Sequence, residues 1–204
     1  MQAHWEKVYH TRGADRVSWF RAHLDTSLAL IQHATQGDCS ADIIDVGAGA
    51  STLVDDLLTA GYAGLTVLDI SENALALARA RLGDAGKSVR WISGDILQPV
   101  LPAKAYDVWH DRAVFHFLVD PAERAAYVRN VVRAVRPGGH VIVSTFGPQG
   151  PHKCSGLDVM RYDSATLHAE FGAKFKLVES VKELHETPSG SKQQFVYCHC
   201  MLLR

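Results

Sequence analysis

Residues 43–52 have the sequence IIDVGAGAST, an apolar segment that ends in an aspartate and a turn of two glycines around an alanine. The apolar half predicts a buried β-strand, because short runs rich in β-branched residues and bounded by glycine favour strands. Beyond the turn, Leu53, Leu57 and Leu58 recur at the spacing of one helix face. A strand that leads through a glycine turn into a helix is the unit from which ligand-binding α/β sheets are built. The stretch therefore predicts an α/β fold with a ligand site near residues 47–51.

The composition favours one soluble domain. The chain has 204 residues, of which 47% are hydrophobic and 21% charged, and it contains no apolar run near the roughly 20 residues that span a membrane. Its net charge of -1 lacks the basic excess that drives binding to nucleic acid. The amino-terminal residues have no apolar core typical of a secretory signal. We expect a cytoplasmic protein with neither membrane nor nucleic-acid partners, and the sequence does not predict its oligomeric state.

The four cysteines do not suggest a metal site or a disulfide framework. Cys39, Cys154, Cys198 and Cys200 include no C-x-x-C pair, and reduced thiols are expected in a long chain without secretory context. In the last predicted strand Cys198 and Cys200 face one side while His199 faces the other, so the three cannot hold one ion together. We predict no metal ligands from this pattern.

Strand-like and helix-like segments alternate from about residue 42 onward, which is typical of a parallel sheet with helical crossovers. The final two strand-like segments are joined by only six residues, TPSGSK, which is too short for a crossover and predicts an antiparallel hairpin. The sequence thus predicts a mostly parallel seven-stranded sheet with a C-terminal antiparallel hairpin and helices on both faces. Expected strands are 42–46, 64–70, 88–96, 106–114, 140–146, 174–186 and 193–203, and expected helices include 51–61, 71–83 and one that begins at 120 and is terminated by 137–139.

Residues that suit a nucleoside ligand follow the predicted strands, at the edge of the sheet where ligands of such folds bind. Asp69 ends the second strand 20 residues after Gly49, where a carboxylate can accept hydrogen bonds from ribose hydroxyls. A dinucleotide site would share this feature, but Ser51 stands where its third glycine is expected. Asp55 and Asp56 also make the following helix start acidic, which disfavours a pyrophosphate. A ligand with a sulfonium and an ammonium group fits such a turn better.

Taken in order along the chain, these motifs resemble those of the class I S-adenosylmethionine-dependent methyltransferases. The resemblance covers roughly residues 40 to 204 and implies a Rossmann-like methyltransferase fold with S-adenosylmethionine as cofactor. It rests on the turn at 45–49, the acidic end of the second strand, Gly94-Asp95-Ile96 after the third, the polar end of the fourth, RPGG before the fifth, and the terminal hairpin.

The resemblance also implies which residues hold the cofactor. The turn would pass beside the methionine part, Asp69 would bind the ribose, and Asp95 would bind the exocyclic amine of an adenine placed between two isoleucines. Main chain near His110 would meet the methionine amino group, and Asp45 either orients the turn or reaches that group. The candidate cofactor-binding residues are Asp45, Gly47, Ala48, Gly49, Asp69, Ile70, Asp95, Ile96 and His110.

Candidate residues for the methyl acceptor lie after the fourth strand and in two flanking segments. Asp111 and His116 are the candidate catalytic groups, although methyl transfer from a sulfonium needs mainly alignment and a base is optional. Trp19, Arg112 and Cys154 are candidate acceptor-side residues. An alternative remains for each group: Asp111 and Arg112 form an ion pair that shapes the loop, and Cys154 is an inert thiol.

We expect a single methyltransferase domain over residues 1–204, with an N-terminal lid and helix at 1–40, a cofactor-binding core at 41–146, and an acceptor-side loop and terminal hairpin at 147–204. Because we expect nearly all of these residues to form the cofactor core and its lids, a small-molecule acceptor is the leading hypothesis. A protein lysine N-methyltransferase is the alternative, because the aromatic N-terminal segment is similar to that of small lysine-modifying members of the superfamily. A noncatalytic S-adenosylmethionine-binding module and an NAD-dependent reductase are further alternatives.

Overall fold

The computed structural model describes residues 1–12, 17–98 and 101–204. Residues 13–16, which belong to the expected N-terminal lid, lie outside this description. The helices are α1 (Gln2–Arg12), α2 (Asp25–Thr35), α3 (Leu53–Thr59), α4 (Glu72–Leu82), η2 (Gly83–Ser88), η3 (Phe115–Phe117), α5 (Pro121–Ala134) and α6 (Ser164–Phe171). The strands are β1 (Asp42–Val46), β2 (Gly64–Asp69), β3 (Arg90–Ser93), β4 (Tyr106–Arg112), β5 (Val135–Phe146), β6 (Lys153–Cys154), β7 (Leu157–Asp158), β8 (Phe175–Glu186) and β9 (Lys192–Leu202).

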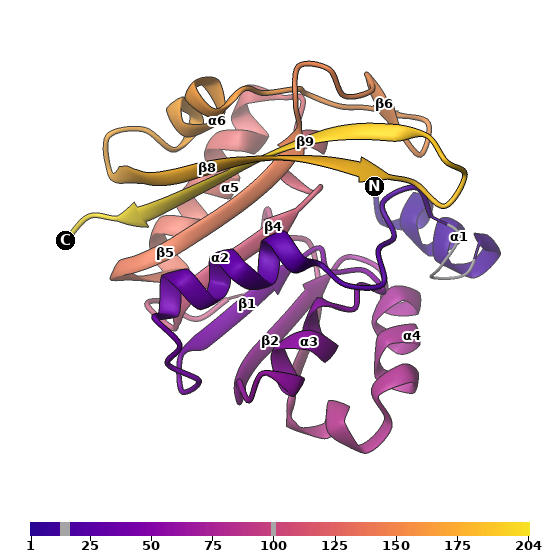
Figure 1. Ribbon diagram of the computed structural model, residues 1–204, viewed down its shortest axis with the longest axis horizontal. Coiled ribbons are helices and arrows are strands. Elements are labelled where there is room, and N and C mark those ends of the chain that lie inside the picture. The colour runs from indigo at the N-terminus through magenta and orange to yellow at the C-terminus, as the bar shows by residue number, and fades with distance from the viewer. Residues whose placement is uncertain (13–16, 99–100) are drawn as a thin grey trace.

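The sheet has the predicted topology. Seven strands are arranged in the order β3-β2-β1-β4-β5-β9-β8, and the first five are mutually parallel while β9 runs antiparallel to both β5 and β8. Helix α2 lies on one face and α5 on the other (Figure 1). The prediction of a mostly parallel α/β sheet closed by an antiparallel hairpin, with helices on both faces, is confirmed.

The two faces of the sheet bury separate hydrophobic layers. One layer joins the sheet to α2 and α3 through fully buried side chains such as Ile31 and Leu57, and the other joins it to α5 and α6 through Tyr127 and Leu167. Within β9, Phe195 and Tyr197 belong to the first layer and Cys198 and Cys200 to the second. This alternation is the period-two pattern of a strand that is buried on both faces.

Local signals fix where several helices begin. Ser71 accepts a hydrogen bond from the Ala74 amide at the start of α4, and Asp120 accepts one from the Ala122 amide at the start of α5. Asp163 begins α6 with a capping box that includes Thr166. Such caps satisfy amide groups that have no partner inside the helix. The first two caps were predicted from the sequence, whereas α6 was not.

The boundary between α5 and β5 differs from the prediction. The helix ends at Ala134 and β5 starts at Val135, so the residues expected to terminate the helix, 137–139, lie inside the strand. Pairing between β4 and β5 is irregular between Tyr106 and Val108. Pro137 has no amide hydrogen to donate, and Gly138 has a φ of +87°, so this part of the strand forms a bulge rather than a regular ladder.

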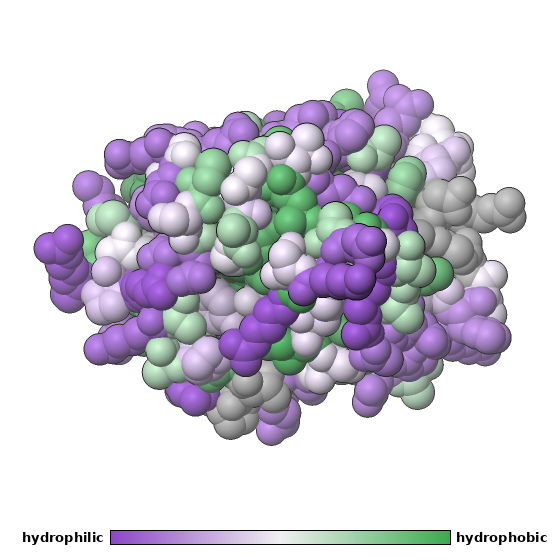
Figure 2. Space-filling model, turned by 90° about the horizontal axis from the view of Figure 1, so that it is seen from below, coloured by the Kyte–Doolittle hydropathy of each residue, from purple (hydrophilic) through white to green (hydrophobic). Residues whose placement is uncertain are grey.

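Polar residues dominate the face shown in Figure 2, where hydrophobic residues gather in a small central area. Within the described parts of the chain, no helix combines the length and the apolar character needed to cross a membrane.

A buried polar contact links β4 to α5 behind the sheet. The Tyr127 hydroxyl donates to the Asp111 carboxylate at 2.5 Å and accepts from the Trp109 indole N–H at 2.9 Å. All three side chains are fully buried. Buried polar groups of this kind cost free energy when one partner is removed, because the remaining groups lose their hydrogen bonds without regaining water.

We predict that Tyr127→Phe lowers the free energy of unfolding by about 2–4 kcal/mol, because it leaves both a buried carboxylate and an indole N–H short of a partner. Tyr62→Phe is the matched control, since among the described residues the Tyr62 hydroxyl has one hydrogen-bond partner, Thr35 at 2.7 Å, and its loss should cost only about 0.5–1.5 kcal/mol. Urea unfolding followed by circular dichroism measures both values. Equal losses in the two variants would contradict the role given to Tyr127.

Candidate functional site

The turn after β1 has the conformation that its glycines were predicted to allow. Gly47 and Gly49 have φ angles of +63° and +58°, a region that side chains strongly disfavour. A Cβ atom added at Gly47 would lie 1.9 Å from Val114 Cγ2, and one at Gly49 would lie 2.0 Å from the Tyr9 hydroxyl oxygen. Both positions therefore require glycine, and the groups that approach them come from the loop after β4 and from α1.

Asp69 at the end of β2 holds the neighbouring loops together. Its carboxylate accepts hydrogen bonds from the Gly49 amide at 2.7 Å and from the Ser71 amide at 2.8 Å, one on each oxygen. Burial raises the pKa of Asp69 to about 6, against the opposing effect of these two amides. A carboxylate has about four acceptor positions, so two remain for a ligand.

A cleft of about 950 Å³ opens beside Asp69, along the carboxyl ends of the parallel strands. The loop on its far side is fixed by Asp95, which accepts a hydrogen bond from the Leu97 amide, and by Asn130, which donates to the Ile96 carbonyl. The predicted cofactor-binding residues that line this cleft are Gly47, Asp69, Ile70, Asp95 and Ile96.

A second, smaller pocket of about 470 Å³ is lined by the other part of the glycine turn, including the predicted residues Asp45, Ala48 and His110. His110 Nδ1 lies 2.7 Å from an Asp45 carboxylate oxygen, and its Nε2 lies 2.9 Å from the Ser27 hydroxyl of α2. All three side chains are buried. Both imidazole nitrogens are thus engaged, so the ring of His110 is held in one orientation.

Two predicted acceptor-side residues, Trp19 and Arg112, line both pockets. Arg112 is held by the Tyr197 hydroxyl at 3.1 Å, by the Trp19 carbonyl at 3.0 Å and by Glu183 at 3.4 Å. Its guanidinium also lies over the Phe195 ring, 4.3 Å from the ring centre. Arg112 shares Glu183 with Arg21, which pairs with the same carboxylate oxygen at 3.2 Å, and it shapes the wall between the pockets through its several protein partners. Arg112 therefore pairs with Glu183 and not with Asp111, the partner considered in the sequence analysis.

Cys154 lies in β6 and lines the larger cleft. Burial raises the pKa of its thiol to about 12. The thiol is therefore protonated at neutral pH, and a protonated thiol is a poor nucleophile and a poor metal ligand. This environment favours the inert-thiol interpretation of Cys154.

The two predicted catalytic residues do not line either pocket within the described chain. Asp111 faces α5, where it accepts hydrogen bonds from Tyr127 and from the Val114 and Phe115 amides, and burial raises its pKa to about 6. His116 is fully buried against Phe117 and Phe146, and burial lowers its pKa to about 3. The geometry corrects the catalytic interpretation of both residues: adjacent β4 residues point to opposite faces, and Asp111 points away from the face that His110 and Arg112 share.

Helix α1 supplies residues that the sequence did not identify. Glu6 accepts hydrogen bonds from the Glu72 and Asn73 amides at the start of α4 and from the Ser71 hydroxyl. Trp5 and Tyr9 line the larger cleft, and Trp5 packs edge to face on Trp19 with ring centres 5.6 Å apart. The sequence predicts a lid from this N-terminal segment. No local pattern, however, indicates that Glu6 caps a helix 65 residues away.

The residues of the two pockets fit an adenosyl sulfonium ligand. Asp69 and Asp95 place carboxylates along the larger cleft and Asp45 places one in the smaller pocket, and these groups favour a cation. At the start of α3, the Leu53 amide donates a hydrogen bond to the Ser51 hydroxyl at 3.2 Å. This amide is therefore already bonded within the protein, whereas a pyrophosphate would need free amides at this position. Arg81 pairs with Asp55 in the same place and also binds the Ala50 and Ser51 carbonyls.

Comparison with known proteins agrees with this fit. Residues 43–139 match the family model described as methyltransferase domain. The chain is 30% identical over 153 residues to malonyl-(acyl-carrier protein) O-methyltransferase of Halalkalibacterium halodurans, covering 72% of this chain and 55% of that protein. It is also 30% identical over 112 residues to EEF1A lysine methyltransferase 2 of Danio rerio, covering 52% and 48%. The chain thus spans about half the length of these curated relatives.

A solved structure shows the same fold at low sequence identity. The N-methyltransferase NodS from Bradyrhizobium japonicum, in complex with S-adenosyl-L-homocysteine, superposes with a TM-score of 0.73 at 15% identity, covering 98% of this chain and 100% of that one. The family match, the strand order and the paired pockets agree with each other. Residues 43–139 thus form a methyltransferase domain, and the family match together with the fold supports the class I S-adenosylmethionine-dependent methyltransferase superfamily, whose cofactor is S-adenosylmethionine.

Proposed function

We propose that this protein transfers the methyl group of S-adenosylmethionine to a small-molecule acceptor. The observation that carries the proposal is the arrangement of two adjoining pockets that share Tyr9, Trp19, Gly47 and Arg112. A two-part ligand can place its nucleoside in one pocket and its amino-acid end in the other. The shared wall is then where the reacting group between these parts lies.

The larger cleft supplies the contacts for the adenosine part. Asp69 would accept hydrogen bonds from the ribose hydroxyls on its two remaining positions, and Asp95 would accept one from the exocyclic amine of the base. Ile70 and Ile96 line the same cleft and provide apolar contact to the two faces of the base. Gly47 lines both pockets, and its missing side chain lets Val114 of the loop after β4 pack against the turn.

The smaller pocket supplies the contacts for the methionine part. Asp45 gives it a buried carboxylate that attracts the ammonium group, and His110 holds that carboxylate in place through a 2.7 Å contact. Tyr9 and Trp19 contribute ring faces at the boundary between the pockets, and such faces attract cations. When bound, S-adenosylmethionine supplies an electrophilic methyl group on a sulfonium that leaves as a neutral thioether.

The chain contributes to methyl transfer chiefly by alignment. Holding two reactants in line is worth about 7–11 kcal/mol in intramolecular models. The wall formed by Trp19 and Arg112 is rigid, because Arg112 has three protein partners and stacks on Phe195. We therefore place the acceptor against this wall, with α1 above it as a lid that excludes water.

A small acceptor fits the enclosure of the site. Trp5 and Phe117 close the larger cleft with ring centres 5.1 Å apart, and Cys154 of the connection between β5 and α6 lines another side. A macromolecular substrate would have to insert a side chain between these elements. The similarity to a lysine methyltransferase of Danio rerio supports that arrangement as the second candidate function, with a lysine of a protein as acceptor.

We predict that S-adenosylhomocysteine binds about ten- to hundredfold more weakly to Asp69→Asn, because charged hydrogen bonds to the ribose contribute about 1.5–3 kcal/mol. Since burial raises the pKa of Asp69 to about 6, affinity of the unsubstituted protein should also rise as the pH rises through 6, when the carboxylate becomes ionised. Calorimetric titrations between pH 5 and 8 measure both effects. Asp84→Asn is the control, since that carboxylate is exposed. Unchanged affinity in Asp69→Asn would show that the ribose lies elsewhere.

We predict that Cys154→Ser keeps kcat close to that of the unsubstituted protein, since a thiol with a pKa of about 12 is not ionised at pH 7.5. Iodoacetamide should label the exposed Cys39 well before Cys154. Peptide mass spectrometry after timed labelling gives the two rates. Faster labelling of Cys154 would indicate a thiolate, and with it a direct role in the reaction.

We predict that label from methyl-tritiated S-adenosylmethionine enters the metabolite fraction of a cell lysate. The lysate is separated by filtration into metabolites and proteins, and each fraction is incubated with the purified protein and with Asp69→Asn as the impaired control. Label that enters only protein bands would reject the small-molecule proposal in favour of the lysine alternative. Label that enters neither fraction, despite binding of S-adenosylhomocysteine, would favour a noncatalytic module.

A further inference from the structure

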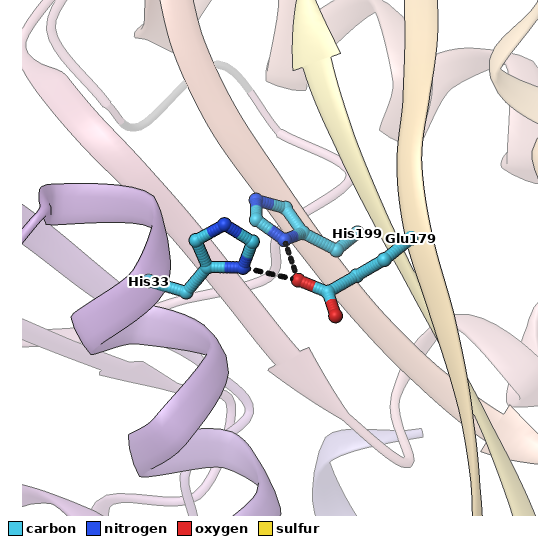
Figure 3. A group of neighbouring side chains, drawn as sticks. All are labelled: His33, Glu179 and His199. Carbon is cyan, nitrogen blue, oxygen red and sulfur yellow. Dashed lines mark hydrogen bonds and ion pairs between the residues drawn. The ribbon is translucent and has the colours of Figure 1, made fainter.

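Three side chains with metal-binding atoms converge on the face of the sheet that α2 covers, away from the two pockets. His33 lies near the end of α2, while Glu179 of β8 and His199 of β9 are directly paired across the hairpin. His199 also pairs with Ile142, in the middle of β5, whereas the pockets lie beyond the end of that strand. Figure 3 shows the two imidazole rings directed at the carboxylate from different elements.

The candidate ligand atoms are close enough to surround one ion. His33 Nδ1, His199 Nδ1 and a Glu179 oxygen all lie within 4.8 Å of one another. Both nitrogens contact the same oxygen, Oε1, with the His199 contact at 3.2 Å and the His33 contact shorter. Ligand atoms around a tetrahedral Zn²⁺ are about 3.3 Å apart, given bond lengths of about 2.0–2.1 Å. The partly exposed side chains of His33 and Glu179 are the ones that would adjust to reach that spacing.

A neighbouring histidine offers His199 a hydrogen-bond partner that is compatible with coordination. His199 Nε2 lies 2.8 Å from Nδ1 of His140 on β5. A histidine that coordinates through Nδ1 carries its proton on Nε2, and that N–H needs an acceptor; His140 Nδ1 supplies it. Metal-binding histidines commonly donate their other N–H to a protein group in this way, which fixes the ring.

The exposure of the three residues allows an ion to enter. The side chain of His199 is 1% exposed, that of Glu179 34% and that of His33 61%. The buried His199 side chain is therefore the rigid ligand of the site. His33 lies at the surface and can move to admit the ion and a water molecule. Two imidazoles and one carboxylate suit Zn²⁺, Ni²⁺, Co²⁺ or Cu²⁺, whereas Mg²⁺ and Ca²⁺ prefer oxygen ligands alone.

We propose that His33, Glu179 and His199 bind one divalent transition-metal ion, with Zn²⁺ as the expected metal. The ion joins α2 to the terminal hairpin, two elements that are far apart in the sequence. Ser27 and Tyr197 of these elements meet at 3.2 Å behind His110 and Arg112, so the ion stabilises the support of the pocket wall rather than entering the pockets. The earlier prediction of no metal site considered the cysteines and His199 of one strand, not ligands from three elements.

The test is metal titration of tag-free, chelator-treated protein by calorimetry, with Zn²⁺ and then Co²⁺, together with thermal unfolding. We expect one ion per chain, a raised unfolding midpoint because the ion binds the folded state, and a Co²⁺ visible spectrum without thiolate charge transfer. His33→Ala and Glu179→Gln should each weaken binding by at least about tenfold. Both substituted residues are at least partly exposed, so circular dichroism should show intact folding.

His23→Ala is the matched control, because His23 is also an exposed histidine paired with a carboxylate, Asp56 at 2.8 Å, with its side chain 69% exposed. It should bind Zn²⁺ like the unsubstituted protein, and so should Cys39→Ser. The proposal is overturned if the unsubstituted protein binds neither ion, or if His33→Ala and Glu179→Gln bind as it does. A thiolate charge-transfer band that is lost in Cys39→Ser would likewise overturn it, by assigning the ion to a cysteine.

Discussion

The cofactor edge of this protein depends on one buried carboxylate, that of Asp69. Each of its oxygens accepts a backbone amide, one from the glycine turn after β1 and one from the start of α4. Burial makes the charge costly, as the raised pKa of about 6 shows, and the two amides offset part of that cost. Removing the carboxylate would therefore remove a hydrogen bond to each of these two segments as well as a contact to the ligand. The same group that shapes the turn is the one that we propose to bind the ribose.

A second constraint comes from the alternation of side chains along β4. His110 and Arg112 point to the face covered by α2, where they line the pockets, while Trp109 and Asp111 point to α5, where they form a closed buried contact with Tyr127. Two of these four neighbouring residues thus line the pockets, and the other two form part of the buried packing against α5. A polar residue at the end of a parallel strand is a good candidate for function, but its face decides whether it meets a ligand.

The terminal hairpin supports the pocket wall from behind. A chain of contacts runs from Asp45 through His110 and Ser27 to Tyr197 and Arg112, with every link between 2.7 and 3.2 Å. It joins the glycine turn, α2 and β9 through side chains that are almost entirely buried. Such fully satisfied networks fix the geometry of a site, since breaking one link leaves its neighbours without partners. The proposed metal site lies on the same two elements, α2 and the hairpin.

Sequence patterns alone determined the succession of strands and helices from β1 to β5, the glycine turn, the place of Asp69 at the end of the second strand, the caps of α4 and α5, and the antiparallel hairpin. All of these follow from residues close together in the chain, whose apolar periods and turn chemistry act locally. Tertiary packing decided the rest: that Glu6 caps α4, that Asp111 faces α5, that Arg112 pairs with Glu183, and that His33 meets His199. These contacts join residues up to 166 positions apart, and they depend on how the helices lie on the sheet, which no local pattern specifies.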